Sequence, residues 1–452
     1  MSTTAIIVLL FFVVSIPLSL WRPFYGILAW TFVAFVNPQW LAWGVNHDIA
    51  RAEVIAIPTL IGLVISTRNW RSVVTRECGL LLLLWIWFTL TSLISSDTPL
   101  FASHSAETWA RWKFVSIILV MTYATVLVVN TRERLRMVLI VIAASFGLFI
   151  FKAIPFMITT GGNFKLYGPD YSMLSDNNDF GLALNMTLPI FFFLAQTEER
   201  PWARRICWLL CLGTIPAIFF TYSRGALVGL MAVMLALFLQ LKQRRFVILI
   251  VVGMSLAIGI LFAPQKWRDR MGTLDDSAQG TLDASAQSRI NAWTYSWRLA
   301  TDYPITGGGF DTYTPELFDR YAPNRQDVHG PHSVYFGVLA EHGFVGLALY
   351  LALLASSFLT TGWAIKYGNA QDDAVAVGYG RMLRVSMVGF MVSGAFLGRA
   401  YFDYLFTIIA LTTVLKYSLR TEWRLAEAEY VPDEEQQDLE YSDMKRHLDI
   451  WR

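Results

Sequence analysis

The sequence predicts an all-α polytopic membrane protein with about 12 transmembrane helices and one large helical loop outside the membrane. Two observations predict this fold class. Hydrophobic residues make up 55% of the 452 residues and charged residues only 15%, whereas a soluble domain carries about 25% charged residues. Apolar runs near the ~18 residues that cross a bilayer also recur along the chain. The longest, "SVYFGVLAEHGFVGLALYLALLASSFLTTGW" (333–363), reads as one unbroken apolar segment.

Short basic loops alternate with the predicted spans and orient them. These loops are "RNWRSVVTRE", "NTRERLR", "EERPWARR" and "KQRR", and the positive-inside rule places them in the cytoplasm. The chain then divides into N-terminal transmembrane helices (1–263), a large loop on the side opposite the cytoplasm (264–332), C-terminal transmembrane helices (333–420) and an acidic cytoplasmic tail (421–452). The first apolar segment has no basic region before it, so we expect a retained helix and not a signal peptide.

The loop 264–332 is predicted to contain its own amphipathic helix. In "SAQSRINAWTYSWRLATDYP" the residues that recur at helical spacing are Ile290, Trp293, Trp297 and Ala300. A Trp-rich amphipathic helix between two spans is typical of an element that lies along the membrane interface. "TGGGF" (306–310) then turns the chain, since glycine permits positive φ or a close backbone approach.

Polar residues near membrane depth are the candidates for a site, because a charge at a helix centre costs roughly 2.5–3.5 kcal/mol. Arg224 lies in "TYSRGA", an outer-side turn where the positive-inside rule favours no arginine. Arg289 begins the amphipathic helix, and His332 immediately precedes the span 333–363. The alternatives are that Arg224 reaches lipid phosphates, that Arg289 is an exposed helix residue and that His332 is structural.

Further polar residues share the outer side. Lys152 lies inside a span, where it either reaches outward to the interface or contacts an anion, and Arg111 flanks a helix start as an interface anchor or a substrate contact. In "YSMLSDNNDFGLALN" (171–185) a helix cap explains only one of four consecutive polar residues, so Asp176 and Asn178 are predicted to contact substrate. In "GRAYFDYLF" (398–406), Arg399 and Asp403 form either an ion pair that braces the site or an ordinary helix turn.

Half of the six histidines, namely His329, His332 and His342, lie within fourteen positions. No cysteine, further histidine or carboxylate accompanies them at a metal-ligand spacing, so we expect no metal and no cofactor. His342 is expected to pack internally and His329 to support the site. A net charge of +2 gives no nucleic-acid signal.

Two guanidiniums and one imidazole on the outer side favour a phosphate ligand. Guanidinium forks bind phosphate with two hydrogen bonds and keep their charge, and an imidazole near neutral pH accepts a proton from a hydroxyl. A lipid-linked phosphate or pyrophosphate suits a site of this kind at a lipid interface.

The ordered set "YSRGALVGL", "SRINAW" and "HSVYFGVLAEHGFVGL" resembles the O-antigen ligase and polymerase superfamily. "SDNNDFGLALNMTLP" and "DYPITGGGF" are also similar to members of this family. The resemblance covers about residues 100–420 and is closest to the O-antigen ligase-like branch found beside exosortase systems in Gram-negative bacteria.

The resemblance implies a metal-free, inverting glycosyltransferase in the inner membrane with a periplasmic active site. Its partners would be an undecaprenyl-diphosphate-linked glycan donor, a lipid A–core acceptor and membrane lipids. Arg224 and Arg289 would hold the diphosphate, and His332 would activate the acceptor hydroxyl. Tyr222 and Tyr335, which lie in the motifs of Arg224 and His332, are predicted to bind substrate.

Three alternatives remain open at this point. An O-antigen polymerase and a protein O-oligosaccharide ligase belong to the same superfamily, and the motifs do not separate them from an O-antigen ligase. A transporter for a lipid-linked glycan would place ionisable residues at the bilayer midplane and show internal repeats, neither of which the sequence favours.

Overall fold

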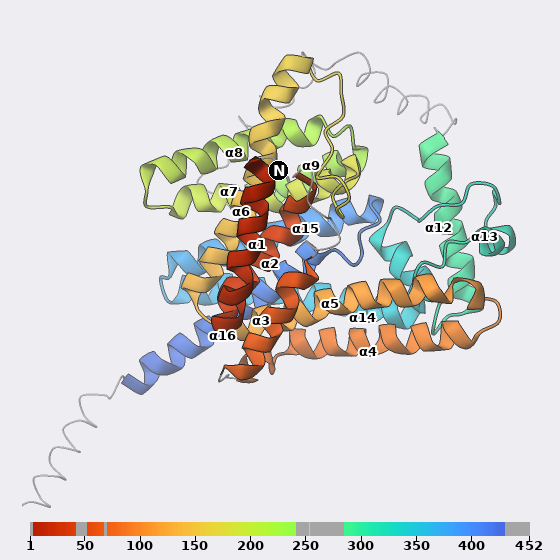
Figure 1. The fold of residues 1–452 in the computed structure, drawn as a ribbon, viewed down its shortest axis with the longest axis horizontal. Coiled ribbons are helices and arrows are strands. Elements are labelled where there is room, and N and C mark those ends of the chain that lie inside the picture. The colour runs from red at the N-terminus through yellow and green to blue at the C-terminus, as the bar shows by residue number, and fades with distance from the viewer. Residues whose placement is uncertain (1–2, 42–51, 67–69, 241–252, 254–283, 430–452) are drawn as a thin grey trace, which may run out of the picture.

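The computed structural model describes residues 3–41, 52–66, 70–240, 253 and 284–429, which form helices and no strand (Figure 1). The α-helices are α1 (Thr3–Trp21), α2 (Pro23–Val36), α3 (Glu53–Ile65), α4 (Arg76–Asp97), α5 (Ser105–Val128), α6 (Arg132–Thr160), α7 (Asn177–Thr197), α8 (Pro201–Phe219), α9 (Arg224–Gln240), α12 (Ala284–Asp302), α13 (Pro315–Tyr321), α14 (Val334–Ala370), α15 (Ala374–Ser393) and α16 (Asp403–Glu429). The 3-10 helices are η1 (Pro38–Leu41), η2 (Trp70–Val73), η3 (Ala102–His104) and η5 (Gly394–Phe396). The predicted all-α class is therefore confirmed.

Eight of the described helices are long and apolar enough to cross a membrane. They are α1, α4, η3 with α5, α6, α7, α8, α14 and α15 with η5. The predicted number of about 12 is not confirmed. Three predicted spans correspond to the shorter apolar helices α2, α3 and α9, the segment 246–263 lies almost entirely outside the described residues, and the segment 400–418 falls at the start of α16, which runs on to Glu429.

Side-chain caps set where several helices begin. Thr75 accepts a hydrogen bond from the backbone N–H of Cys78 at the start of α4, and Thr131 accepts one from Arg134 at the start of α6. Asp176 does the same for Asn178 at the start of α7. Each cap satisfies one backbone N–H that the first helical turn leaves without a partner.

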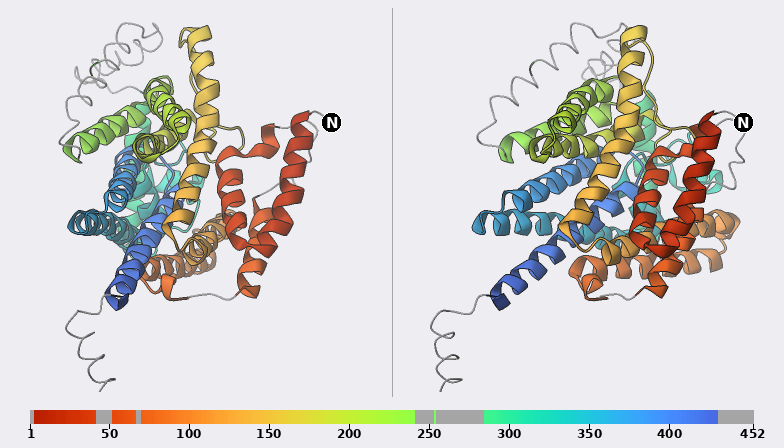
Figure 2. Two further views of the ribbon diagram at one scale, coloured as in Figure 1. Left: turned by 90° about the vertical axis from the view of Figure 1, so that its left-hand side faces the viewer. Right: turned by 60° about the vertical axis from the view of Figure 1, so that its left-hand side comes forward.

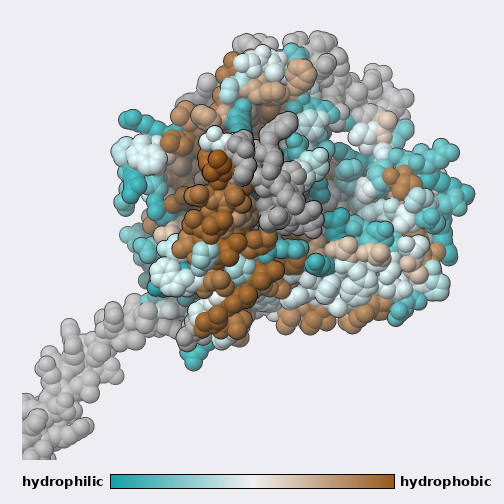
Figure 3. Space-filling view, viewed as in Figure 1, coloured by the Kyte–Doolittle hydropathy of each residue, from teal (hydrophilic) through white to brown (hydrophobic). Residues whose placement is uncertain are grey.

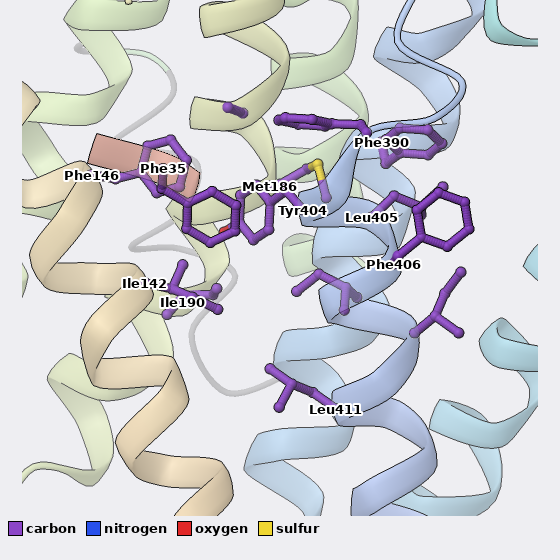
Figure 4. Close-up of a cluster of buried hydrophobic side chains, with 14 of the residues drawn as sticks. Phe35, Ile142, Phe146, Met186, Ile190, Phe390, Tyr404, Leu405, Phe406 and Leu411 are labelled. Carbon is purple, nitrogen blue, oxygen red and sulfur yellow. The ribbon is translucent and has the colours of Figure 1, made fainter. Parts of the chain in front are cut away.

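Buried aromatic residues join helices from both halves of the chain (Figure 4). The ring of Tyr404 on α16 lies 4.9 Å from that of Phe35 on α2 and 5.2 Å from that of Phe146 on α6. The Tyr404 hydroxyl also contacts Thr187 on α7 at 3.0 Å. The N-terminal and C-terminal helices therefore share one core.

The N-terminal helices expose apolar side chains. α1–α3 form a layer that joins the remaining helices through α2 on α6 (Figure 2). Figure 3 shows apolar surface over this layer and along α4. Ile7 and Leu10 on α1 are 64% and 61% exposed. Exposed apolar surface of this extent on helices that could span a membrane is expected where lipid covers it.

Ion pairs gather at the two ends of the bundle. At one end Arg136 pairs with Glu198 at 2.6 Å, Arg132 pairs with Asp373, and Lys416 lies 3.3 Å from Glu77. The predicted cytoplasmic loops "NTRERLR" and "EERPWARR" are thus held together at this end. The residues predicted to face outward lie at the other end, which we call the outer end of the bundle.

The predicted amphipathic helix is α12, and its packing differs from the expectation. Ala292, Tyr295 and Leu299 are buried against the short helix α13, with the rings of Tyr295 and Phe318 stacked 4.3 Å apart. Ile290 and Trp297 of the predicted stripe are instead 45% and 52% exposed. The described residues 284–332, which include α12 and α13, form a lobe that precedes α14. The helix α12 is therefore apolar on two faces, one of which packs within this lobe.

The span predicted as unbroken over 333–363 is interrupted at Gly343. This residue has φ 67° and ψ −170° inside α14, a conformation that is essentially restricted to glycine. The turn "TGGGF" (306–310) forms backbone hydrogen bonds with the residues around this interruption. Gly308 and Gly309 donate hydrogen bonds to the carbonyls of Ala340 and Glu341, both at 2.9 Å, and the N–H of Phe344 donates to Pro304 at 2.8 Å. The sequence expectation was wrong because apolar composition does not report where a backbone breaks.

We expect Gly343→Ala to lower the free energy of unfolding by at least about 3 kcal/mol, from backbone strain and overpacking together. A Cβ at this position would lie 2.5 Å from the carbonyl oxygen of Ile305. Thermal unfolding of the purified protein in detergent measures the effect. Gly79→Ala is the control, because nothing lies within 4 Å of an added Cβ in α4. Equal stability of the two variants would contradict a required break.

Candidate functional site

A polar cavity of about 330 Å³ lies at the outer end of the bundle. Its lining comes from α5, the segment that leads into α7, the lobe, the start of α14 and the segment before α16. The lining residues are Arg111, Met173, Asp179, Asp311, Tyr313, Gly330, Pro331, His332, Ser333, Gly337, Glu341, Gly398, Arg399, Ala400 and Tyr401. Elements distant in the sequence thus place both acidic and basic side chains around one space.

His332 lies at the rim of this cavity in an unusual backbone conformation. Its φ is 44°, and positive φ is uncommon for residues other than glycine. The preceding residue, Pro331, accepts a hydrogen bond of 2.7 Å from the indole of Trp293 on α12. Gly398 packs so closely that an added Cβ would lie 3.6 Å from the His332 Cα. The lobe and the segment before α16 therefore hold the backbone of His332 and of the preceding residue from two sides.

The surroundings of His332 favour its neutral form. Although the side chain is open to solvent at the rim, partial burial among its neighbours lowers its pKa, and the positive charge of Arg289 lowers it further. Asp176 acts in the opposite direction and raises the pKa. The net direction is downward, so the imidazole is a proton acceptor at neutral pH.

Arg289 reaches this region from α12. The residue is half-buried, and it is close enough to His332 to affect the imidazole's pKa. Its neighbour Ser288 hydrogen-bonds to the ring of His329, and the rings of His329 and His332 lie 5.7 Å apart. His329, which was expected to support the site, therefore lies against Ser288 of α12 and next to His332.

Arg224 is the first residue of α9 and is half-buried. An added Cβ on its neighbour Gly225 would lie 2.9 Å from the Cβ of Phe396. The carbonyl of Thr221 accepts a hydrogen bond of 2.6 Å from the Asn177 amide at the start of α7. The start of α9 and the turn before it are therefore fixed against η5 and the start of α7 at the outer end.

The predicted cluster 176–179 resolves into four separate contacts. Asp176 caps α7: its carboxylate accepts hydrogen bonds from the backbone N–H of Asn178 at 2.8 Å and from the side-chain amide of Asn178 at 2.9 Å. Asn177 holds the turn before α9, and Asp179 pairs with Arg399 at 2.6 Å. The ion pair considered between Arg399 and Asp403 is therefore made with Asp179, because α7 lies closer to the guanidinium.

Arg111, read from the sequence as an interface anchor or a substrate contact, lines the cavity. Its guanidinium pairs with the carboxylate of Asp311, with a shortest distance of 3.0 Å. Lys152 is exposed on α6 and is not among the residues that line the cavity. Tyr222 and Tyr335 are also not lining residues; their hydroxyls donate hydrogen bonds of 2.7 Å to the backbone carbonyls of Gly162 and Met391.

Sequence reasoning missed the inner part of the cavity. Glu341 is 5% exposed, and its carboxylate accepts hydrogen bonds from the Asp311 N–H at 3.1 Å and from the Tyr401 hydroxyl. It lies roughly 10 Å along α14 from the start of the helix by helical rise. The available signal was an acidic residue inside an apolar segment, which marks a functional or bracing position by default.

His342 packs internally, as expected. It is fully buried, its Nδ1 lies 2.7 Å from the hydroxyl of Thr91, and its ring lies 4.2 Å from that of Phe88 and 4.4 Å from that of Phe310. It therefore fixes α14 against α4 and the lobe.

We expect the pKa of His332 to lie below its ordinary value of about 6.5. Arg289→Gln should raise this pKa by removing a nearby positive charge. Asp176→Asn should lower it, and asparagine caps a helix as well as aspartate does. Histidine-selective NMR of the detergent-solubilised protein, assigned with His332→Gln, measures all three values. Shifts of the same sign in both variants would contradict the electrostatic origin.

Two family models match the chain. The model described as O-antigen ligase matches residues 209–351, and a family of unknown function, DUF5935, matches residues 3–198. A search of curated proteins finds no match. Arg224, Arg289 and His332 all lie in the first matched segment, whereas Arg399 lies beyond both. This multi-pass helical membrane protein is therefore similar to the O-antigen ligase family over residues 209–351.

Proposed function

We propose that this protein is an O-antigen ligase of the Gram-negative inner membrane. It transfers a glycan from undecaprenyl diphosphate to the lipid A–core oligosaccharide at the periplasmic face, with inversion at the anomeric carbon and without a metal. The observation that carries the proposal is the position of Arg289 beside a neutral His332 at the rim of a polar cavity. Both residues belong to the segment that matches the O-antigen ligase family.

Arg224 and Arg289 are assigned to the diphosphate. Negative charge develops on the bridging oxygen as the diphosphate leaves, and fixed guanidiniums stabilise that charge where other glycosyltransferases use a metal ion. Each guanidinium also offers a planar fork that matches phosphate oxygens. The absence of a D-x-D motif from the sequence agrees with this assignment.

His332 is assigned as the general base. The acceptor hydroxyl transfers its proton to the imidazole while its oxygen forms a bond to the anomeric carbon. The bond from that carbon to the diphosphate breaks, and its electron pair leaves with undecaprenyl diphosphate. Attack from the side opposite the leaving group inverts the anomeric configuration.

The remaining predicted residues receive supporting roles in this proposal. Arg111, Asp176 and Asn178 lie in or beside the cavity, where their polar groups contact the transferred sugar or the acceptor. Lys152 contacts lipid phosphate from the surface of α6. Tyr222 and Tyr335 bind neighbouring backbone carbonyls and position the segments of Arg224 and His332.

Arg224→Ala and Arg289→Ala are each expected to reduce transfer by at least about 10²-fold, the cost of losing one preorganised contact to the developing charge. Arg→Lys at either position should also impair transfer, since a point charge replaces the fork. Arg325→Ala is the matched control, because this side chain is 67% exposed and pairs with Asp319. The assay follows glycan transfer by the purified, folded variants. Near-normal rates in both alanine variants would remove the diphosphate assignment.

His332→Ala is expected to abolish transfer to lipid A–core in the presence of EDTA, because the acceptor hydroxyl loses its base. The wild-type protein should give a glycosylated product that survives EDTA, resolved by gel electrophoresis. Longer glycan chains in place of that product would identify a polymerase, and transfer to a protein hydroxyl would identify a protein O-ligase. A donor that is never consumed would contradict the proposed transferase.

A further inference from the structure

Arg399 lies between η5 and α16 and lines the cavity. Its Nη2 lies 2.6 Å from Oδ2 of Asp179, and the two side chains are 27% and 10% exposed. Asp179 stands in the first turn of α7. A carboxylate from another helix therefore holds the Nη2 end of the guanidinium.

The segment that carries Arg399 contacts the surroundings of two predicted catalytic residues, His332 and Arg224. Gly398 packs against the backbone of His332, and Phe396 packs against Gly225 beside Arg224. The charge of Arg399 acts on the His332 imidazole in the same direction as that of Arg289. Arg399 thus joins Arg224, Arg289 and Arg111 as a guanidinium at the outer end of the bundle.

Part of the guanidinium is left for a ligand. An arginine side chain has five N–H donors, and the carboxylate of Asp179 engages the Nη2 end. The Nε of Arg399 is buried and has no hydrogen-bond partner among the residues that the structure describes. A buried donor without a partner costs free energy, and phosphate oxygens are acceptors that match the guanidinium fork.

We propose that Arg399, held by Asp179, binds the diphosphate of the lipid-linked donor as a third arginine. The inference rests on the proposed function, because it takes the donor to be a polyprenyl diphosphate. Asp179 is a positioning residue: it sets the direction of the guanidinium of Arg399, a side chain that lines the cavity.

A purely structural ion pair makes a different prediction from a ligand contact. If Arg399 only ties its segment to α7, removal of either partner has the same consequence. If Arg399 binds phosphate, Arg399→Gln removes the donors, whereas Asp179→Asn keeps them and removes a negative charge beside the anion. The two variants therefore separate the two roles.

The test is equilibrium binding of labelled undecaprenyl diphosphate to the full-length protein in detergent, without acceptor. We expect Arg399→Gln to weaken binding about tenfold, as for the loss of one hydrogen bond to a charged group. Asp179→Asn should weaken binding less than Arg399→Gln does, because the guanidinium remains and only the contact that positions it is altered. Arg325→Gln, on the exposed side of the lobe, should bind as wild type does.

Competition identifies the chemistry that is recognised. Inorganic pyrophosphate should displace the labelled lipid from wild type and displace it less well from Arg399→Gln, whereas undecaprenol, which lacks phosphate, should not distinguish the two. If Arg399→Gln does not fold, Arg399→Lys keeps the pair with Asp179 but not the fork, and should bind more weakly than wild type.

Equal weakening by Arg399→Gln and Asp179→Asn, with equal losses of thermal stability, would overturn the inference and leave a structural ion pair. Wild-type binding and transfer in Arg399→Gln would overturn it while leaving the proposed transferase intact. A wild-type protein that neither binds undecaprenyl diphosphate nor transfers a glycan would overturn the proposed function itself.

Discussion

The site depends on the pairing between the glycine turn and the interruption of α14. Two backbone N–H groups of the turn donate hydrogen bonds to the carbonyls of Ala340 and Glu341. The carbonyl of Pro304, just before the turn, accepts a hydrogen bond from the N–H of Phe344. These bonds satisfy backbone groups that a broken helix would otherwise leave without partners in an apolar environment. They join the lobe to the span at a depth that neither element reaches alone.

The consequences of this pairing extend along the lobe in both directions. Towards α12 it fixes the end of the helix whose start carries Arg289. Towards α14 it places Asp311 beside Arg111 and against the buried carboxylate of Glu341. The cavity wall is therefore built by a loop that is paired to a membrane helix, and a rigid support of this kind is what positions reacting groups accurately.

Charge neutralisation is the second constraint on the molecule. Several cations that point inward at the two ends of the bundle meet a carboxylate from a distant segment, as in Arg111 with Asp311 and Arg399 with Asp179 at one end, and Lys416 with Glu77 at the other. Pairing lowers the cost of charge near hydrocarbon. At the outer end the paired residues also surround a cavity, so neutralisation and ligand binding use the same side chains.

Composition and periodicity by themselves determined the all-helical membrane class, the amphipathic helix of the lobe and the end of the bundle at which Arg224, Arg289 and His332 lie. These properties follow from local apolar length, helical spacing and loop charge. The inner packing of His342 also followed from its depth in a span.

Only the tertiary structure decided the break at Gly343, the partners of Glu341 and Asp311, and the choice of Asp179 over Asp403 as the partner of Arg399. Each of these joins segments separated by many residues, and the strength of an ion pair or a hydrogen bond depends on a distance in space. The order of residues in the chain does not specify that distance.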